Sequence, residues 1–144
     1  MTRTFNENNA VRMVHTPDDA YDTVATYGTW INMQGFRRVT FIPLAAGLSG
    51  NIVCKPYEAT DASGTNAAEI DTALAGTFAN GTDENLPGII EVRDSDLTAD
   101  YNFVTLQVTP VGSDPFACVA ILSEPYEAPV TNTVNTHVAF NVGE

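Results

Sequence analysis

The chain has 144 residues, which suits one domain that buries a sizeable core without the help of disulfides. With 18 acidic and 6 basic residues the formal net charge is −12, so the surface repels phosphate backbones and nucleic acid is not an expected partner. No apolar run approaches the ~20 residues that cross a bilayer, and the N-terminal residues lack an apolar signal region. We therefore expect no membrane partner and no signal peptide.

Residues 1–20 show little periodicity and many turn formers, which predicts either an N-terminal arm with one short strand or, in the isolated chain, a disordered terminus. Residues 22–34 form the first clear strand region, and Gly28 indicates a bulge or a strand break within it. Trp30 is the only tryptophan, and we expect it to anchor the core.

Residues 37–60 contain two extended runs rich in β-branched and aromatic residues. Small residues at 45–50 separate the runs and indicate a reversal of the chain. This stretch is predicted to form a central β-hairpin on which the flanking segments pack.

A short helix is predicted after the hairpin. Asn66 is a candidate N-cap, Glu69 follows at the capping-box spacing, and Gly76 is placed to end the helix. The expected helix is about ten residues long.

Three further strands are expected at 88–93, 102–109 and 116–122. The second alternates most regularly, with Val104, Leu106 and Val108 facing inward. The third is apolar at almost every position, as in a strand covered on both faces. Short strands, regular turns and one short helix predict a mainly β fold, an antiparallel β-sandwich of jelly-roll or Ig-like type. Its expected core contains Trp30, Phe41, Val104, Leu106 and Ile121.

The last segment, residues 128–144, is too apolar for a solvated tail and too irregular for a core strand, so we interpret it as a second arm. The predicted organisation is an N-terminal arm (1–20), a β-sandwich domain (21–127) and a C-terminal arm (128–144). The arms carry apolar and basic side chains that would be stabilised against neighbouring subunits. The expected interface residues are Arg3, Phe5, Val11, Arg12, Val134, Val138 and Phe140.

Nothing in the sequence indicates an active site or a cofactor. Cys54 and Cys118 lie in predicted strands and are expected to be buried free thiols. Residues 94–100 resemble the start of a calcium-binding loop, but Ala99 stands where that loop requires glycine, so a solvated turn is the interpretation. His15 and His137 lie in the arms and the carboxylates are scattered, so we expect no enzyme, no metal site and no cofactor.

Several segments together resemble small virion proteins of tailed bacteriophages. They are the stretch Glu58–Thr65 before the short helix, the strand at 90–93 with its acidic turn at 94–97, the aromatic-led strand at 101–109, and the final strand that ends in Pro125 and Tyr126. The resemblance covers roughly residues 22–130. Proteins of this kind are similar to capsid decoration (cement) proteins or to other small head-associated components.

The resemblance implies a structural protein of the virion, made in the host cytoplasm, that binds the outer capsid surface and stabilises the head. Its expected partners are the major capsid protein and copies of itself, in a symmetric oligomer with a trimer favoured. The family carries no catalytic residues to transfer. The alternative is a head or tail appendage module that recognises a host-surface glycan or protein. An exposed aromatic cluster beside polar side chains would favour the alternative, and apolar arms would favour decoration.

Overall fold

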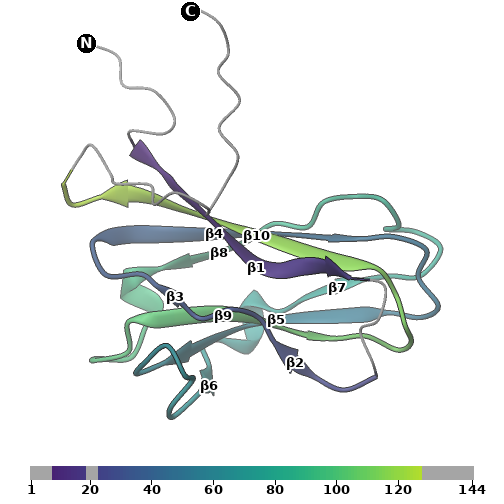
Figure 1. Ribbon diagram of the computed structural model, residues 1–144, viewed down its shortest axis with the longest axis horizontal. Coiled ribbons are helices and arrows are strands. Elements are labelled where there is room, and N and C mark those ends of the chain that lie inside the picture. The colour runs from purple at the N-terminus through teal and green to yellow at the C-terminus, as the bar shows by residue number, and fades with distance from the viewer. Residues whose placement is uncertain (1–7, 19–22, 128–144) are drawn as a thin grey trace, which may run out of the picture.

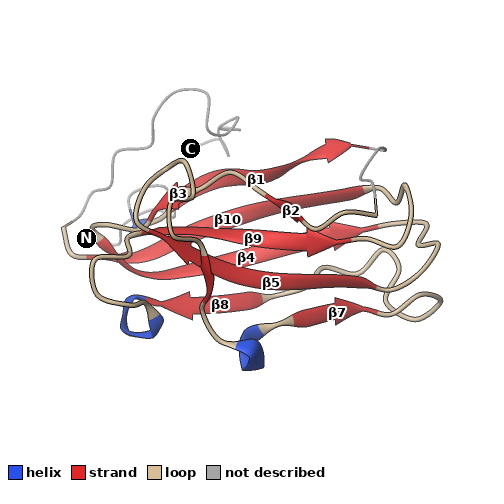
Figure 2. Cartoon of the chain, turned by 90° about the horizontal axis from the view of Figure 1, so that it is seen from below, coloured by secondary structure: helices blue, strands red, loops and turns tan. Residues whose placement is uncertain are grey.

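The computed structural model describes residues 8–18 and 23–127, which form a sandwich of two antiparallel β-sheets (Figures 1 and 2). Sheet A contains, in spatial order, β1 (Ala10–Asp18), β10 (Phe116–Pro125), β4 (Phe36–Ala45) and β8 (Ile90–Arg93). Sheet B contains β2 (Thr26–Tyr27), β9 (Phe103–Thr109), β5 (Ile52–Ala59) and β6 (Ala68–Glu69), with β3 (Ile31–Asn32) paired to β9 and β7 (Gly76–Phe78) paired to β5. The predicted antiparallel β-sandwich is confirmed.

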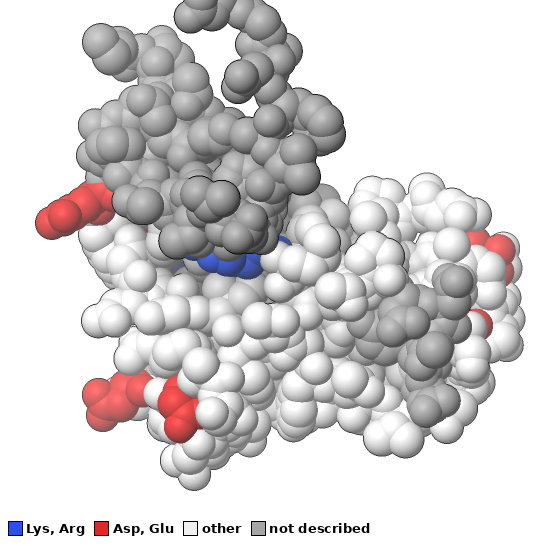
Figure 3. Space-filling model, viewed as in Figure 1, with Lys and Arg blue, Asp and Glu red and all other residues white. Residues whose placement is uncertain are grey.

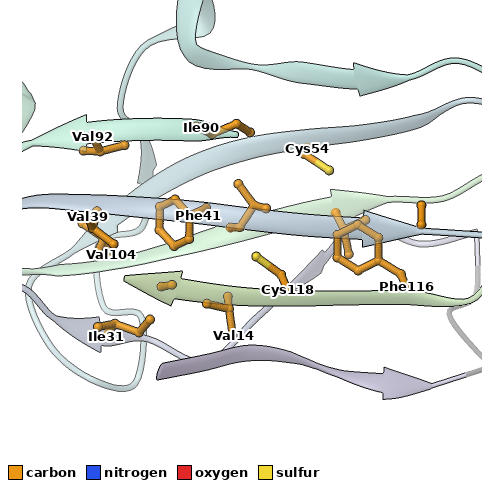
Figure 4. Close-up of a cluster of buried hydrophobic side chains, with 14 of the residues drawn as sticks. Val14, Ile31, Val39, Phe41, Cys54, Ile90, Val92, Val104, Phe116 and Cys118 are labelled. Atoms are coloured by element: carbon orange, nitrogen blue, oxygen red, sulfur yellow. The ribbon is translucent and has the colours of Figure 1, made fainter. Parts of the chain in front are cut away.

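The core lies between the sheets and is built mainly from alternate residues of β4, β5, β9 and β10 (Figure 4). Val104, Leu106 and Val108 of β9 are fully buried, as predicted. Cys54 from sheet B and Cys118 from sheet A are both buried free thiols, also as predicted. Burial raises the pKa of the Cys54 thiol to about 12, so it behaves as a small apolar side chain.

Two expected core residues lie elsewhere. Ile121 is half-buried on the outer side of β10, because the inward set of that strand is even-numbered, from Phe116 to Leu122. Trp30 is only partly buried and follows β2 on the outer side of sheet B. Because the run at 116–122 is apolar throughout, the sequence does not indicate which alternate residues of β10 face the core. In the structure the even-numbered ones do.

The predicted central hairpin is wrong. Strand β4 pairs with β10 and β8 in sheet A, whereas β5 pairs with β9, β6 and β7 in sheet B. Residues 46–51 therefore form an arch that carries the chain from one sheet to the other. The backbone N–H of Ser49 donates to Asp114 Oδ1 at 2.8 Å, and that of Ala46 donates to the Pro115 carbonyl at 3.2 Å.

The predicted helix at 66–76 is also wrong. Asn66 has a φ of 58°, and Ala68 and Glu69 pair with β5 as strand β6. Asp71 then caps η1 (Thr72–Leu74), a single 3-10 turn, by accepting the N–H of Ala73. Pairing with β5 therefore overrides a local helix signal. The other 3-10 turn, η2 (Asp94–Asp96), follows β8 (Figure 2).

Strand β1 closes one side of the sandwich, so the sandwich takes in residues 10–18 of the segment expected to be an arm. The buried His15 ring donates from Nε2 to the Leu106 carbonyl in sheet B at 2.7 Å. The N–H of Thr29 donates to the Val14 carbonyl at 2.8 Å. Gly28 allows this approach, since a Cβ there would lie 2.6 Å from Val14 Cγ1, and it separates β2 from β3 as predicted.

Truncating Leu106 tests the assignment of the core. Leu106→Ala should lower the free energy of unfolding by about 2–5 kcal/mol, because it leaves a cavity between the sheets. Leu44→Ala removes the same atoms from a side chain that is 45% exposed and should cost about 1 kcal/mol or less. Equal losses in chemical denaturation would contradict this assignment.

Burial of His15 predicts a specific pH dependence of stability. Desolvation lowers the pKa of His15 below 6.5, so below that pH the unfolded chain takes up a proton that the folded chain refuses. Stability should fall from pH 7 downward, by up to about 1.4 kcal/mol per pH unit, until the pKa of the folded state is reached.

The matched variant is His15→Gln, which retains a donor for Leu106 but does not titrate. Denaturation curves at pH 7.5 and 5.5 should show a smaller loss for the variant than for the wild type. His137 is present in both proteins and cancels in the comparison. An identical loss in the two proteins would show that His15 does not control this dependence.

Candidate functional site

The outer face of sheet A is apolar. We call it the aliphatic face and define it by Val11, Met13, Ile42, Leu44, Ala117, Val119 and Ile121. Its cross-strand rows are Val11, Ile121 and Thr40; then Met13, Val119 and Ile42; then Ala117 and Leu44. Paired residues share one side of a sheet, so these side chains form a continuous surface over three strands.

This surface is incompletely covered. Met13 is 42% exposed and Leu44 is 45% exposed, and the other members are half-buried. All described strands belong to the two sheets, so no third layer of described strands lies over the face. The open side of an antiparallel sheet is ordinarily polar, and a contiguous apolar patch marks an interaction surface.

A hollow of about 340 Å³ adjoins the Leu44 end of the aliphatic face. Pro17, Leu44, Ala46, Pro115 and Ala117 contribute to its mostly apolar lining. A concavity of this kind can receive an anchoring side chain from a partner, as the centres of protein interfaces commonly do.

Ion pairs border the opposite end of the face. Arg38 pairs with Glu91 at 3.3 Å and with Glu124, while Arg93 lies 3.6 Å from Glu91. Solvent-exposed pairs of this type contribute little to stability. They give the aliphatic face a charged rim, which resembles the polar margin of a protein interface.

Charge is sparse on the side where β1, β2 and β3 form the edges of the sheets. Figure 3 shows this side: acidic groups lie toward the margins of the described surface, and the centre is uncharged apart from a basic patch. For a chain of net charge −12 this distribution is uneven. The centre of the described surface on this side therefore carries few acidic groups.

The structure describes two of the seven predicted interface residues. Val11 belongs to the aliphatic face. Arg12 lies on the other side of β1, in register with buried Ala120, and its Nη1 donates to the Val11 carbonyl at 2.9 Å. The remaining five lie outside the described residues: Arg3, Phe5, Val134, Val138 and Phe140.

Most of the aliphatic face was not predicted from the sequence, although the sequence contains a signal for it. The run at 116–122 predicts a strand covered on both sides. Within one chain the core covers the even-numbered side, and Ala117, Val119 and Ile121 remain on the outer side. β10 is thus apolar on both faces, and no described strand packs on its outer face. A strand of this kind indicates an interface.

His, Cys, Asp and Glu side chains are dispersed over the described residues. Among them, no group of three or more His, Cys, Asp or Glu side chains could hold a metal ion. The acidic stretch at 94–100 forms a turn, in which Asp96 accepts the N–H of Arg93 at 2.9 Å. No helix in the described ranges is long and apolar enough to cross a membrane.

No protein-family model matches the sequence, and no curated protein matches it. Among solved structures the chain is similar to that of the SPBc2 prophage-derived protein YomS, with 18% sequence identity and a TM-score of 0.51. The alignment covers 86% of this chain and 99% of YomS. At this identity the likeness shows a shared fold.

Proposed function

We propose that the protein is a structural component of a tailed-phage virion that decorates the outer capsid surface and stabilises the head. It acts as a symmetric homo-oligomer, with a trimer favoured, and its partners are the major capsid protein and its own copies. It performs no catalysis, and its place is the assembled particle. The resemblance over residues 22–130 and the fold shared with a prophage-derived protein support a phage origin.

The observation that carries the proposal is the aliphatic face. Burying an exposed aliphatic side chain completely contributes roughly 1.5–3 kcal/mol. Met13 and Leu44 gain about half of that because they are already partly covered. Such modest gains become useful when a symmetric assembly repeats them, since each further contact is then intramolecular.

The acidic charge fits the same role. Net charge keeps free subunits apart before assembly, and the ion-paired rim around Arg38 sets the boundary of the contact. Paired strands around one apolar core suit a part that reinforces a shell.

Location, copy number and a face variant test the proposal together. Purified particles should carry the protein in hundreds of copies on the head, whereas about a dozen or fewer at one vertex or on the tail would contradict decoration. Val119→Lys places a charge in the middle of the aliphatic face and should weaken binding to undecorated particles at least about tenfold.

The matched control is Val24→Lys, at a position that is 65% exposed and away from the face. It should bind as the wild type does. Circular dichroism must first show that both variants are folded. Because Val119 is half-buried, Met13→Lys provides a second test at a more exposed position. Unchanged binding by the folded face variants would rule out this docking face.

Truncation tests the expected role of the C-terminal segment. A chain that ends after Ala128 lacks Val134, Val138 and Phe140 and should remain a folded, soluble β domain. Without these side chains it should neither form its oligomer on a sizing column nor remain on particles. An unfolded truncated chain would place the segment in the core, and normal assembly would show that it does not attach the protein.

A further inference from the structure

The outer face of sheet B differs from the aliphatic face because it carries aromatic rings. Tyr27 comes from β2, Tyr57 from β5, and Trp30 from the segment between β2 and β3; we call them the aromatic cluster. The ring centroids of Tyr27 and Trp30 are 5.5 Å apart, and those of Tyr27 and Tyr57 are 5.1 Å apart. Tyr27 is 42% exposed, so part of the cluster is open to solvent.

Polar side chains lie in the adjacent cross-strand positions. Gln107 pairs with Tyr27 on one side and with Lys55 on the other, so its side chain lies in the same cross-strand row as the Tyr27 ring. Glu69 pairs with Tyr57, and its Oε2 accepts a hydrogen bond from Lys55 Nζ at 3.0 Å. The rings are therefore flanked by an amide and by a carboxylate whose charge is matched by an ammonium.

The cluster is buttressed by the loop that precedes β6. Gly64 packs against the Trp30 indole, and a Cβ at that position would lie 2.6 Å from Nε1. Its φ of 79° also favours glycine. Asp61 holds the loop by accepting the N–H groups of Ser63 at 2.8 Å and Thr65 at 3.1 Å. The loop thus fixes the position of Trp30 before any ligand arrives.

This arrangement matches the chemistry of a sugar ring. The apolar C–H groups of a pyranose can stack on aromatic faces, while its hydroxyls need donors and acceptors at the edge of the stack. Gln107 and the Lys55–Glu69 pair supply both without a net local charge. The net charge of −12 disfavours an anionic ligand.

We propose that the aromatic cluster, with Gln107, Lys55 and Glu69, is a binding site for a neutral saccharide. The site lies on the opposite sheet from the aliphatic face. A subunit docked through sheet A would therefore present the saccharide site outward. The aromatic cluster meets the criterion given above for a module that recognises a glycan, and the proposal does not depend on capsid decoration.

Trp30 provides a direct readout because it is the only tryptophan in the chain. The full-length protein is titrated separately with chitohexaose, cellohexaose and maltohexaose up to about 10 mM, and its fluorescence is followed. At least one of the three should change the Trp30 emission in a saturable way, and polygalacturonate should not. No saturable change with any of the three, or binding of polygalacturonate alone, would overturn the proposal.

Variants separate the site from the rest of the surface. Tyr27→Ala should weaken the saturable response at least about tenfold, whereas Tyr27→Phe retains the ring and should retain most of the binding. The matched control is Tyr126→Ala, which removes a 56% exposed tyrosine that contacts Arg37. Equal loss in Tyr27→Ala and Tyr126→Ala would overturn the assignment.

A particle-binding assay on Tyr27→Ala keeps the two proposals apart. The variant should bind undecorated particles as the wild type does, since Tyr27 belongs to sheet B. Loss of particle binding together with loss of the saccharide response would assign the cluster to docking instead.

Discussion

The sandwich depends on the arch at residues 46–51, which moves the chain from sheet A to sheet B. Asp114 is buried and holds the arch by accepting the N–H of Ser49. A Cβ at Gly112 would lie 2.3 Å from Ser49 Oγ, so that hydroxyl would have to move. If β5 instead folded back on β4, their inner faces would lie in one sheet. Phe41 and Ile52, both fully buried, would then have no opposing layer. Burial of both inner faces requires the crossing.

The crossing also creates two outer faces with different chemistry. β4 and β10 present aliphatic side chains outward, whereas β2, β5 and their neighbours present aromatic and polar ones. A face of mostly aliphatic side chains favours a close contact with protein, and a face of rings and hydrogen-bonding groups favours a small polar ligand. The two proposals therefore occupy separate surfaces of one domain.

The stretch at 58–65, which contributes to the family resemblance, holds two loops of this fold in place. Glu58 is buried and accepts the backbone N–H of Thr98 at 2.8 Å, which ties the loop after η2 to β5. Asp61 organises its own turn, and Gly64 supports Trp30. A motif of this kind can persist because it shapes a loop, and it says little about the partner that the protein binds.

The sequence alone determined the properties that depend on residues adjacent in the chain. Alternation in 102–109 established that Val104, Leu106 and Val108 face inward, and Gly28 marked the break between β2 and β3. Part of the candidate docking face could also be predicted from the sequence. Val11 was expected at an interface, and the run at 116–122 indicated a strand covered on both faces.

Only the tertiary structure decided which strands pair and which faces meet. A hairpin and an arch need similar turn residues, so residues 45–50 could not reveal that β5 pairs with β9. The capping-box pattern from Asn66 predicts a helix, but residues 68 and 69 instead form strand β6 and pair with β5. The sequence predicts Trp30 in the core, whereas in the fold its indole lies beside the nearby Tyr27 ring and against Gly64 of the distant loop before β6. Alternation is a local property of the chain, whereas pairing and burial are set by residues distant in sequence.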